Sequence, residues 1–64
     1  MLKINDVIEV APFATVPDFW KRGIVIDVSD YVTVEYMLGI DTRHFSFMHE
    51  GYRKDTQVRG YDDE

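Results

Sequence analysis

Apolar residues occupy every second position in two neighbouring stretches of the chain, residues 23–28 and 32–36. A short polar break, residues 29–31, separates the two stretches. Side chains of a β-strand point alternately to the two faces of a sheet, so a period of two on both sides of a break predicts a two-stranded hairpin with one buried face. The predicted fold class is therefore all-β.

Other apolar stretches extend this hairpin and predict three further strands. The five expected strands cover residues 4–10, 19 or 20 to 28, 32–37, 42–48 and 56–61. The first connecting loop contains Pro12 and Pro17, which cannot donate to a β-ladder and so exclude a central strand there. Residues 38–41 are expected to form a second turn, and residues 52–55 are compatible with a single helical turn.

Five short strands with one longer loop after the first predict a small, partly open antiparallel barrel, because closure protects the edge strands of a sheet. The alternation places the following side chains in the interior: Ile8, Val10, Ile24, Ile26, Val28, Val32, Val34, Tyr36, Phe45, Phe47 and Val58. We expect one domain over residues 1–61 and a frayed acidic end at residues 62–64.

The length limits how the chain can be stabilised. A core in a chain of 64 residues rarely supplies more than about 3–5 kcal/mol. Cysteine is absent, which excludes disulfides and thiolate metal sites and leaves good packing or a homo-oligomer as the extra source of stability. The chain starts at Met1 with neither a basic and apolar leader nor a membrane-length apolar run, which predicts a cytoplasmic protein without membrane contact.

The charge balance bears on the class of partner. Seven basic and twelve acidic residues leave a net charge of −5. Binding to a phosphate backbone requires clustered positive charge, so this balance counts against nucleic acid as the main ligand. It favours a protein partner with a basic surface.

Three stretches of the chain resemble the SH3-like small barrels, including the KOW and Tudor-type branches. They are residues 5–10, 23–28 and 32–36. Family members commonly have Gly-Asp where this chain has Asn5-Asp6, and the nucleic-acid-binding members carry basic loops that are missing here. The resemblance implies a five-stranded antiparallel SH3-like barrel, and its KOW and Tudor branches imply a nucleic-acid- or ribosome-associated binding domain as the alternative function.

Residues 41–50 contain the side chains that suggest an active site or a metal site. His44 and His49, with Asp41 and Glu50 nearby, suggest zinc, but side chains five apart on one strand point to opposite faces and converge only if the chain turns. Ser46 shares a face with His44, which suggests a nucleophile and a base. Catalysis also needs an orienting acid, an oxyanion site and a concave pocket, and a barrel this small usually fills its interior with side chains. We therefore expect no enzyme activity, no metal and no cofactor.

Aromatic residues in or beside the loops are the stronger candidates for a binding site. The candidates are Phe19, Trp20, Tyr31 and Tyr52. Such rings line grooves for proline-rich peptides or cages for methylated cations in barrels of this kind, and they also cap the open ends of small barrels. Both interpretations stay open. Phe19 and Trp20 are the expected exposed pair, because Asp18 and Lys21 flank them.

Three apolar residues occupy alternate strand positions whose side chains are expected to face solvent. They are Val25, Met37 and Met48, which either form a contiguous patch for a partner or are covered by the curvature of the barrel or by the first loop. Four basic residues in the second half, Arg43, Arg53, Lys54 and Arg59, are expected to lie on a surface of mixed charges, with a small nucleic-acid contact as the minority interpretation.

The sequence as a whole indicates a non-enzymatic, acidic protein-interaction module. Its size and charge suit a small regulator or inhibitor, for example one encoded by a phage or mobile element, that acts on a host protein handling nucleic acid. The expected contact residues are the aromatic and apolar candidates named above.

Overall fold

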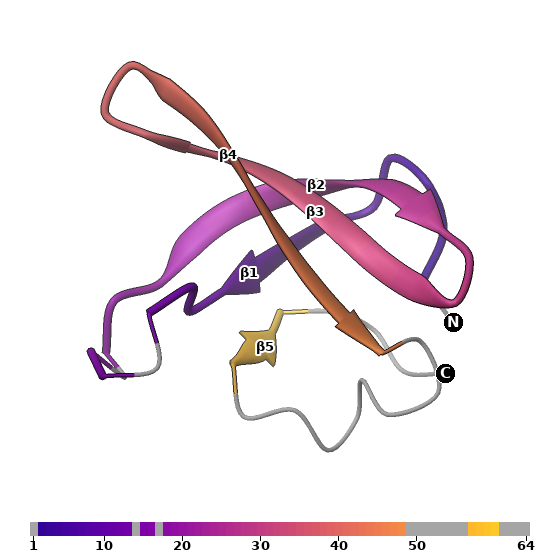
Figure 1. Cartoon of the computed structure of the whole chain (residues 1–64), viewed down its shortest axis with the longest axis horizontal. Helices are drawn as coiled ribbons and strands as arrows, with labels where there is room; N and C mark the ends of the chain where they lie inside the picture. Colours follow the sequence, from indigo (N-terminus) through magenta and orange to yellow (C-terminus); the bar gives the residue numbers. More distant parts are fainter. Residues whose placement is uncertain (1, 14, 17, 49–56, 61–64) are drawn as a thin grey trace.

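The chain folds into one antiparallel sheet of five strands in the order β4-β3-β2-β1-β5 (Figure 1). The computed structural model describes residues 2–13, 15–16, 18–48 and 57–60. The strands are β1 (Val7–Val10), β2 (Lys21–Val28), β3 (Tyr31–Leu38), β4 (Asp41–Met48) and β5 (Val58–Arg59). The predicted all-β class and the number of strands are confirmed. The helical turn expected at residues 52–55 and the acidic end at 62–64 lie outside the described residues.

Two tight turns join the three long strands. Residues 29–30 connect β2 to β3, within the expected break at 29–31, and residues 39–40 connect β3 to β4, within the turn expected at 38–41. Gly39 has a φ of +64°, a conformation that costs a glycine little because it has no Cβ. Within the part of the chain that the structure describes, no helix has the length and apolar character needed to cross a bilayer.

The first strand begins later than the alternation predicted. Residues 3–6 form a turn in which the Asp6 amide donates to the Lys3 carbonyl over 3.0 Å and Asn5 has a φ of 79°. Asparagine is among the few residues that tolerate this left-handed conformation. The turn is held on β2, because the Asn5 amide donates to the Val25 carbonyl over 2.8 Å and the Val25 amide to the Asp6 carbonyl over 2.9 Å.

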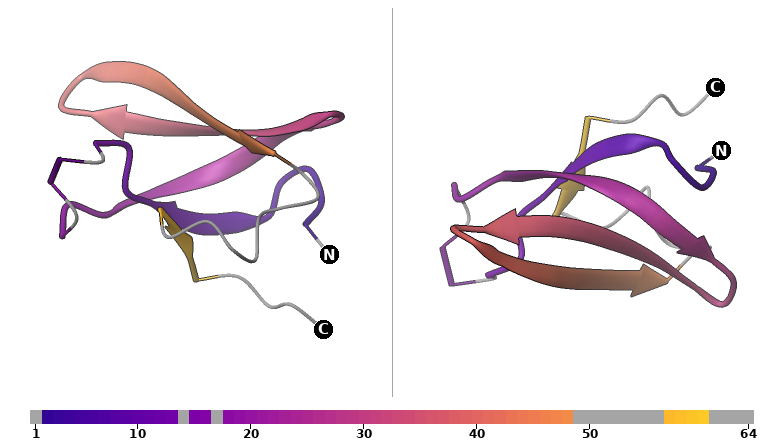
Figure 2. Two further views of the ribbon diagram at one scale, coloured as in Figure 1. Left: turned by 60° about the horizontal axis from the view of Figure 1, so that its bottom comes forward. Right: turned by 90° about the horizontal axis from the view of Figure 1, so that it is seen from above.

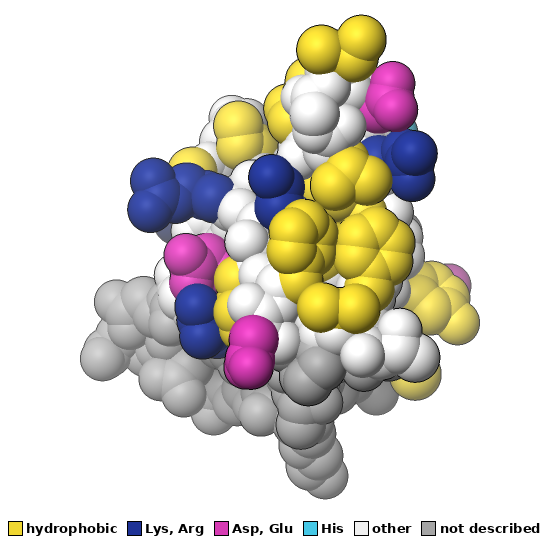
Figure 3. All heavy atoms as spheres, turned by 90° about the vertical axis from the view of Figure 1, so that its left-hand side faces the viewer, with side chains coloured by type: hydrophobic (Ala, Val, Ile, Leu, Met, Phe, Trp, Pro, Cys, Tyr) yellow, Lys and Arg dark blue, Asp and Glu magenta, His cyan; other side chains and the backbone are white. Residues whose placement is uncertain are grey.

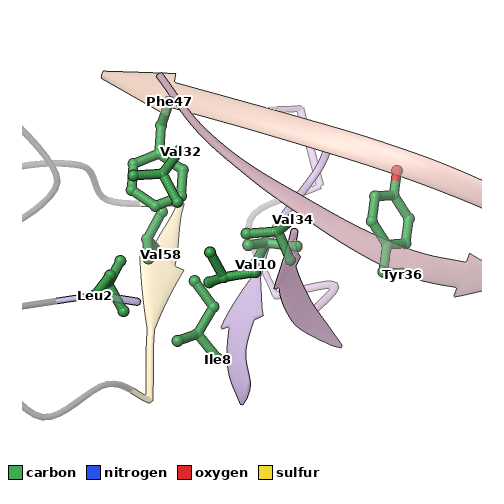
Figure 4. Packing of buried hydrophobic residues seen from close by; sticks show 9 residues of the cluster. Leu2, Ile8, Val10, Val32, Val34, Tyr36, Phe47 and Val58 are labelled. Carbon is green, nitrogen blue, oxygen red and sulfur yellow. The ribbon is translucent and has the colours of Figure 1, made fainter. Parts of the chain in front are cut away.

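The sheet is strongly twisted and curled, so that β4 lies on one side of the core and β1 with β5 on the other (Figures 1 and 2). β4 and β5 are the two edge strands of the sheet. Their inward side chains nevertheless belong to one hydrophobic cluster, since Phe47 of β4 and Val58 of β5 both pack in the core with Val32 of β3 (Figure 4).

Most of the expected interior is correct. Ile8, Val10, Val32, Val34, Tyr36, Phe47 and Val58 are buried, and Val28 and Phe45 pack against them. The expectation for Ile24 and Ile26 is wrong, because their exposed fractions are 46% and 40%. The prediction that Val25 faces solvent is also wrong, because this side chain is 0% exposed and central in the core.

A β-bulge explains why the side chains in the first part of β2 point to the opposite faces from those that the alternation predicted. Val25 is opposite Val34 on β3, whereas Asp27 is opposite Thr33, so the register shifts between the two pairs and β2 has one extra residue there. The extra residue returns Val28 to the inner face. Gly23 and Val25 therefore point inward before the bulge and Val28 points inward after it, which unbroken alternation cannot produce.

Candidate protein-binding surface

The reversed parity of β2 leaves apolar side chains on the outer face of the sheet. Val7 of β1 is directly opposite Ile24 of β2, which is in turn opposite Glu35 of β3. Val7 is 51% exposed and Met37, two residues after Glu35 on the same face, is 48% exposed. Directly opposite residues have Cβ atoms about 4.5–5.5 Å apart. The outer face of β1, β2 and β3 thus presents several apolar groups close together.

These groups line a shallow hollow on the surface. The hollow has a volume of about 500 Å³, and its wall includes Val7, Trp20, Ile24 and Met37, together with the charged Arg22 and Glu35. We call it the outer hollow. Of the residues that the sequence singled out for binding, the structure brings Trp20 and Met37 together here.

Trp20 is half-buried and one of its faces is already occupied. The Arg59 guanidinium lies 4.0 Å from the centre of the Trp20 ring. Arg59 is held in place by Glu9, whose Oε1 accepts a hydrogen bond from Arg59 Nε over 2.8 Å. Because a cation–π contact within the chain uses this ring face, the methylated-cation cage is less suited to Trp20 than a role as one wall of the outer hollow.

Phe19, expected to pair with Trp20, belongs to a different cluster. Its ring centre is 5.7 Å from that of Phe13, and Lys21 Nζ lies 5.8 Å from it. The loop that carries these rings and the turn between β3 and β4 lie at the same end of the molecule, where apolar side chains gather with Lys and Arg side chains around them (Figures 1 and 3). Of these two neighbouring rings, Trp20 lines the outer hollow, and Phe19 packs with Phe13.

The remaining predicted contact residues are dispersed. Met48 is opposite Tyr31 at one end of the β3–β4 hairpin, whereas Met37 is opposite Thr42 near the other end. Thr42 and Met48 are six positions apart along β4, which corresponds to about 20 Å. Val25 is in the core, as described above, so the expected patch of Val25, Met37 and Met48 does not exist. Tyr52 lies outside the described residues.

No family model, curated protein or solved structure matches this chain. Its function is therefore inferred from its own side chains and their arrangement.

The side chains considered for catalysis bind neighbours on β3. His44 Nε2 is 3.3 Å from Glu35 Oε2, and Ser46 Oγ is 3.0 Å from Thr33 Oγ1. Among residues 2–13, 15–16, 18–48 and 57–60, no three His, Cys, Asp or Glu side chains gather where they could hold a metal ion. His49 and Glu50 lie outside those ranges.

Two of the four basic residues expected on a mixed surface are indeed near carboxylates. Arg43 is 3.7 Å from Asp41, and Arg59 is 2.8 Å from Glu9. Arg53 and Lys54 lie outside the described residues. The interpretation as a surface of mixed charges is thus confirmed for Arg43 and Arg59.

Sequence reasoning missed most residues of the outer hollow, among them Val7, Arg22, Ile24 and Glu35. The alternation placed Ile24 in the interior, and only the bulge shows that it lies outside. Gly23 gives a partial signal, because a strand residue without a side chain often marks a close approach between backbones. An ideal Cβ on Gly23 would lie 2.5 Å from Val34 Cγ1, so Gly23 faces the core and its neighbours Arg22 and Ile24 face outward.

Proposed function

We propose that the chain is an SH3-like barrel that works as a non-enzymatic protein-interaction module and binds its partner through the outer hollow. The observation that carries this proposal is the group of exposed apolar side chains on the outer face of β1, β2 and β3, at a hollow of about 500 Å³. Contiguous apolar surface rimmed by polar groups is typical of protein-binding sites.

Two features support the barrel architecture. The consecutive strands β4 and β5 are the two edges of the sheet, and their inward side chains share one core, as expected when a sheet curls until its edges approach. The positive φ of Asn5 also fits the resemblance, because glycine, common at this position in the family, adopts such a conformation most readily.

The partner and the role follow from the size and charge of the chain. A net charge of −5 favours encounter with a protein that has a basic surface, and a small acidic module suits a regulator or inhibitor of a protein handling nucleic acid. Direct nucleic-acid binding, the alternative, has less support, because the guanidinium groups of Arg43 and Arg59 are close to carboxylates.

Met37→Lys is expected to abolish partner binding and leave the fold intact. The side chain is half-exposed in the outer hollow, so a lysine introduces a charge where the partner buries apolar surface. Met48→Lys is the matched control, because Met48 is an exposed methionine of the same sheet outside this hollow. Proteins captured from a lysate by the wild type are compared by mass spectrometry with those captured by the two variants. Proteins lost from both variants, or from neither, would contradict the proposal.

A further inference from the structure

Three charged side chains lie in a row across the outer face, beside the outer hollow. Glu9 of β1 is directly opposite Arg22 on β2 and directly opposite Arg59 on β5. Its carboxylate binds only one of these two cations, Arg59, with the 2.8 Å distance given above. The row therefore contains two guanidinium groups and one carboxylate, and carries one surplus positive charge.

The surplus charge is on Arg22. This side chain is exposed, lines the outer hollow, and makes neither a hydrogen bond nor an ion pair with any residue that the structure describes. Glu35, on β3 at the same hollow, differs in this respect because its Oε2 lies 3.3 Å from His44 Nε2. The hollow thus has an apolar wall, the Glu35 carboxylate beside His44, and a guanidinium, that of Arg22, with no side-chain partner among the described residues. Lys21 lines it as well.

We infer that the outer hollow binds a short acidic segment of the partner protein, with an aliphatic or aromatic side chain in the hollow and an aspartate or glutamate carboxylate on Arg22. This inference rests on the proposed function and adds the chemistry of the partner. A guanidinium presents donors in a planar fork that matches a carboxylate, and such charge-assisted hydrogen bonds are stronger than neutral ones.

The charge of the whole chain limits how acidic this segment is. A net charge of −5 repels a long run of carboxylates and also repels a nucleic-acid strand, which needs several unpaired cations along its backbone. A segment with one or two carboxylates next to an apolar residue pairs with Arg22, and the net charge of the chain repels it much less than a long acidic run. The basic surface proposed for the partner guides the encounter at long range, whereas Arg22 acts at the contact.

Selection from a phage-displayed library of random peptides on the full chain tests the inference and does not require the partner to be identified. We expect the enriched sequences to combine an aliphatic or aromatic residue with Asp or Glu. A selected peptide, synthesised with a fluorescein label, is then measured by fluorescence polarisation. Arg22→Gln is expected to weaken its binding about tenfold, the usual order for losing one charge-assisted hydrogen bond.

Arg43→Gln is the matched control, since Arg43 is an exposed strand arginine that does not line the outer hollow. Its binding should stay within about twofold of the wild type. Circular dichroism verifies that both variants are folded.

Three other outcomes would contradict this inference, and the first of them separates it from the proposed function. Selected peptides that lack acidic residues, or that bind Arg22→Gln as tightly as the wild type, would overturn the acidic segment and leave a protein-binding hollow. If no peptide is enriched, both the inference and the proposed function fail. Tight binding of a single-stranded oligothymidylate that Arg22→Gln abolishes would replace both with nucleic-acid recognition.

Discussion

Val25→Asp is expected to unfold the protein, whereas Ile24→Asp, one residue earlier, leaves it folded. Val25 is 0% exposed and packs in the centre of the core. An unpartnered buried charge costs about 3–5 kcal/mol, and the core of a chain this small supplies about the same amount. Ile24 is 46% exposed on the outer face, so its replacement costs about 1 kcal/mol in lost apolar contact and strand propensity.

Far-UV circular dichroism and the dispersion of amide signals in NMR spectra distinguish the two variants. Val25→Asp should give the spectrum of a disordered chain, and Ile24→Asp that of the native sheet. The same Ile24→Asp protein should have lost partner binding, because the aspartate lies in the outer hollow. A folded Val25→Asp protein, or an unfolded Ile24→Asp protein, would be evidence against the bulge in β2.

Gly23→Ala is expected to lower the free energy of unfolding by about 3 kcal/mol, at the upper end of the costs of overpacking. An ideal Cβ at this position lies 2.5 Å from Val34 Cγ1 and 2.8 Å from the carbonyl oxygen of Glu35. The Val34 side chain is itself fully buried, and the carbonyl belongs to the backbone of the neighbouring strand, so neither moves cheaply. Each kcal/mol lowers the Tm of a domain this size by about 4–8 °C, so the Tm should fall by more than about 12 °C.

Gly39→Asn is the control for this prediction. Nothing lies within 4 Å of an ideal Cβ on Gly39, and only the φ of +64° restricts the position. Asparagine tolerates this conformation, so thermal unfolding should give a loss below about 1 kcal/mol. A Gly23→Ala protein that melts within a few degrees of the wild type would mean that β2 and β3 are not packed as closely as described.

The strands could be predicted from the sequence because each is marked by local chemistry. Alternating apolar residues identified β3 and β4, and Gly39 together with the polar residues 29–30 identified the turns. The start of β1 was wrong, because Ile4 continues the apolar pattern although residues 3–6 form a turn. The turn depends on hydrogen bonds to Val25, a residue distant in sequence, which no local pattern reveals.

The faces of β2 could not be predicted in the same way. Ile24, Ile26 and Val28 alternate as well as any strand in the chain, and both parities place apolar residues inside. A bulge is decided by the pairing of β2 with its neighbours, and one extra residue reverses every side chain before it. The reversal puts Val25 in the core in place of Ile24, and it moves Ile24 to the outer face.

The candidate surface was predicted in part. Trp20 and Met37 were identified from their type and parity, and both line the outer hollow. Phe19, Tyr31 and Met48 were selected on the same grounds, but the pairing of the strands places them elsewhere. Arg22 had no distinguishing feature in the sequence. Its importance comes from Glu9, which lies between two arginines and binds only one of them.

Thiol reactivity of two single-cysteine proteins measures directly which side of β2 faces solvent. The natural chain has no cysteine, so Ile24→Cys and Val25→Cys each introduce one reactive group. Under native conditions we expect a maleimide to modify the Ile24→Cys protein at a rate within about tenfold of that of its denatured form. The Val25→Cys protein should react more than about a hundredfold slower than its denatured form, because a buried thiol reacts only when the structure opens. Equal rates in the two folded proteins, or faster modification of Val25→Cys, would contradict the outward position of Ile24 and with it the proposed binding surface.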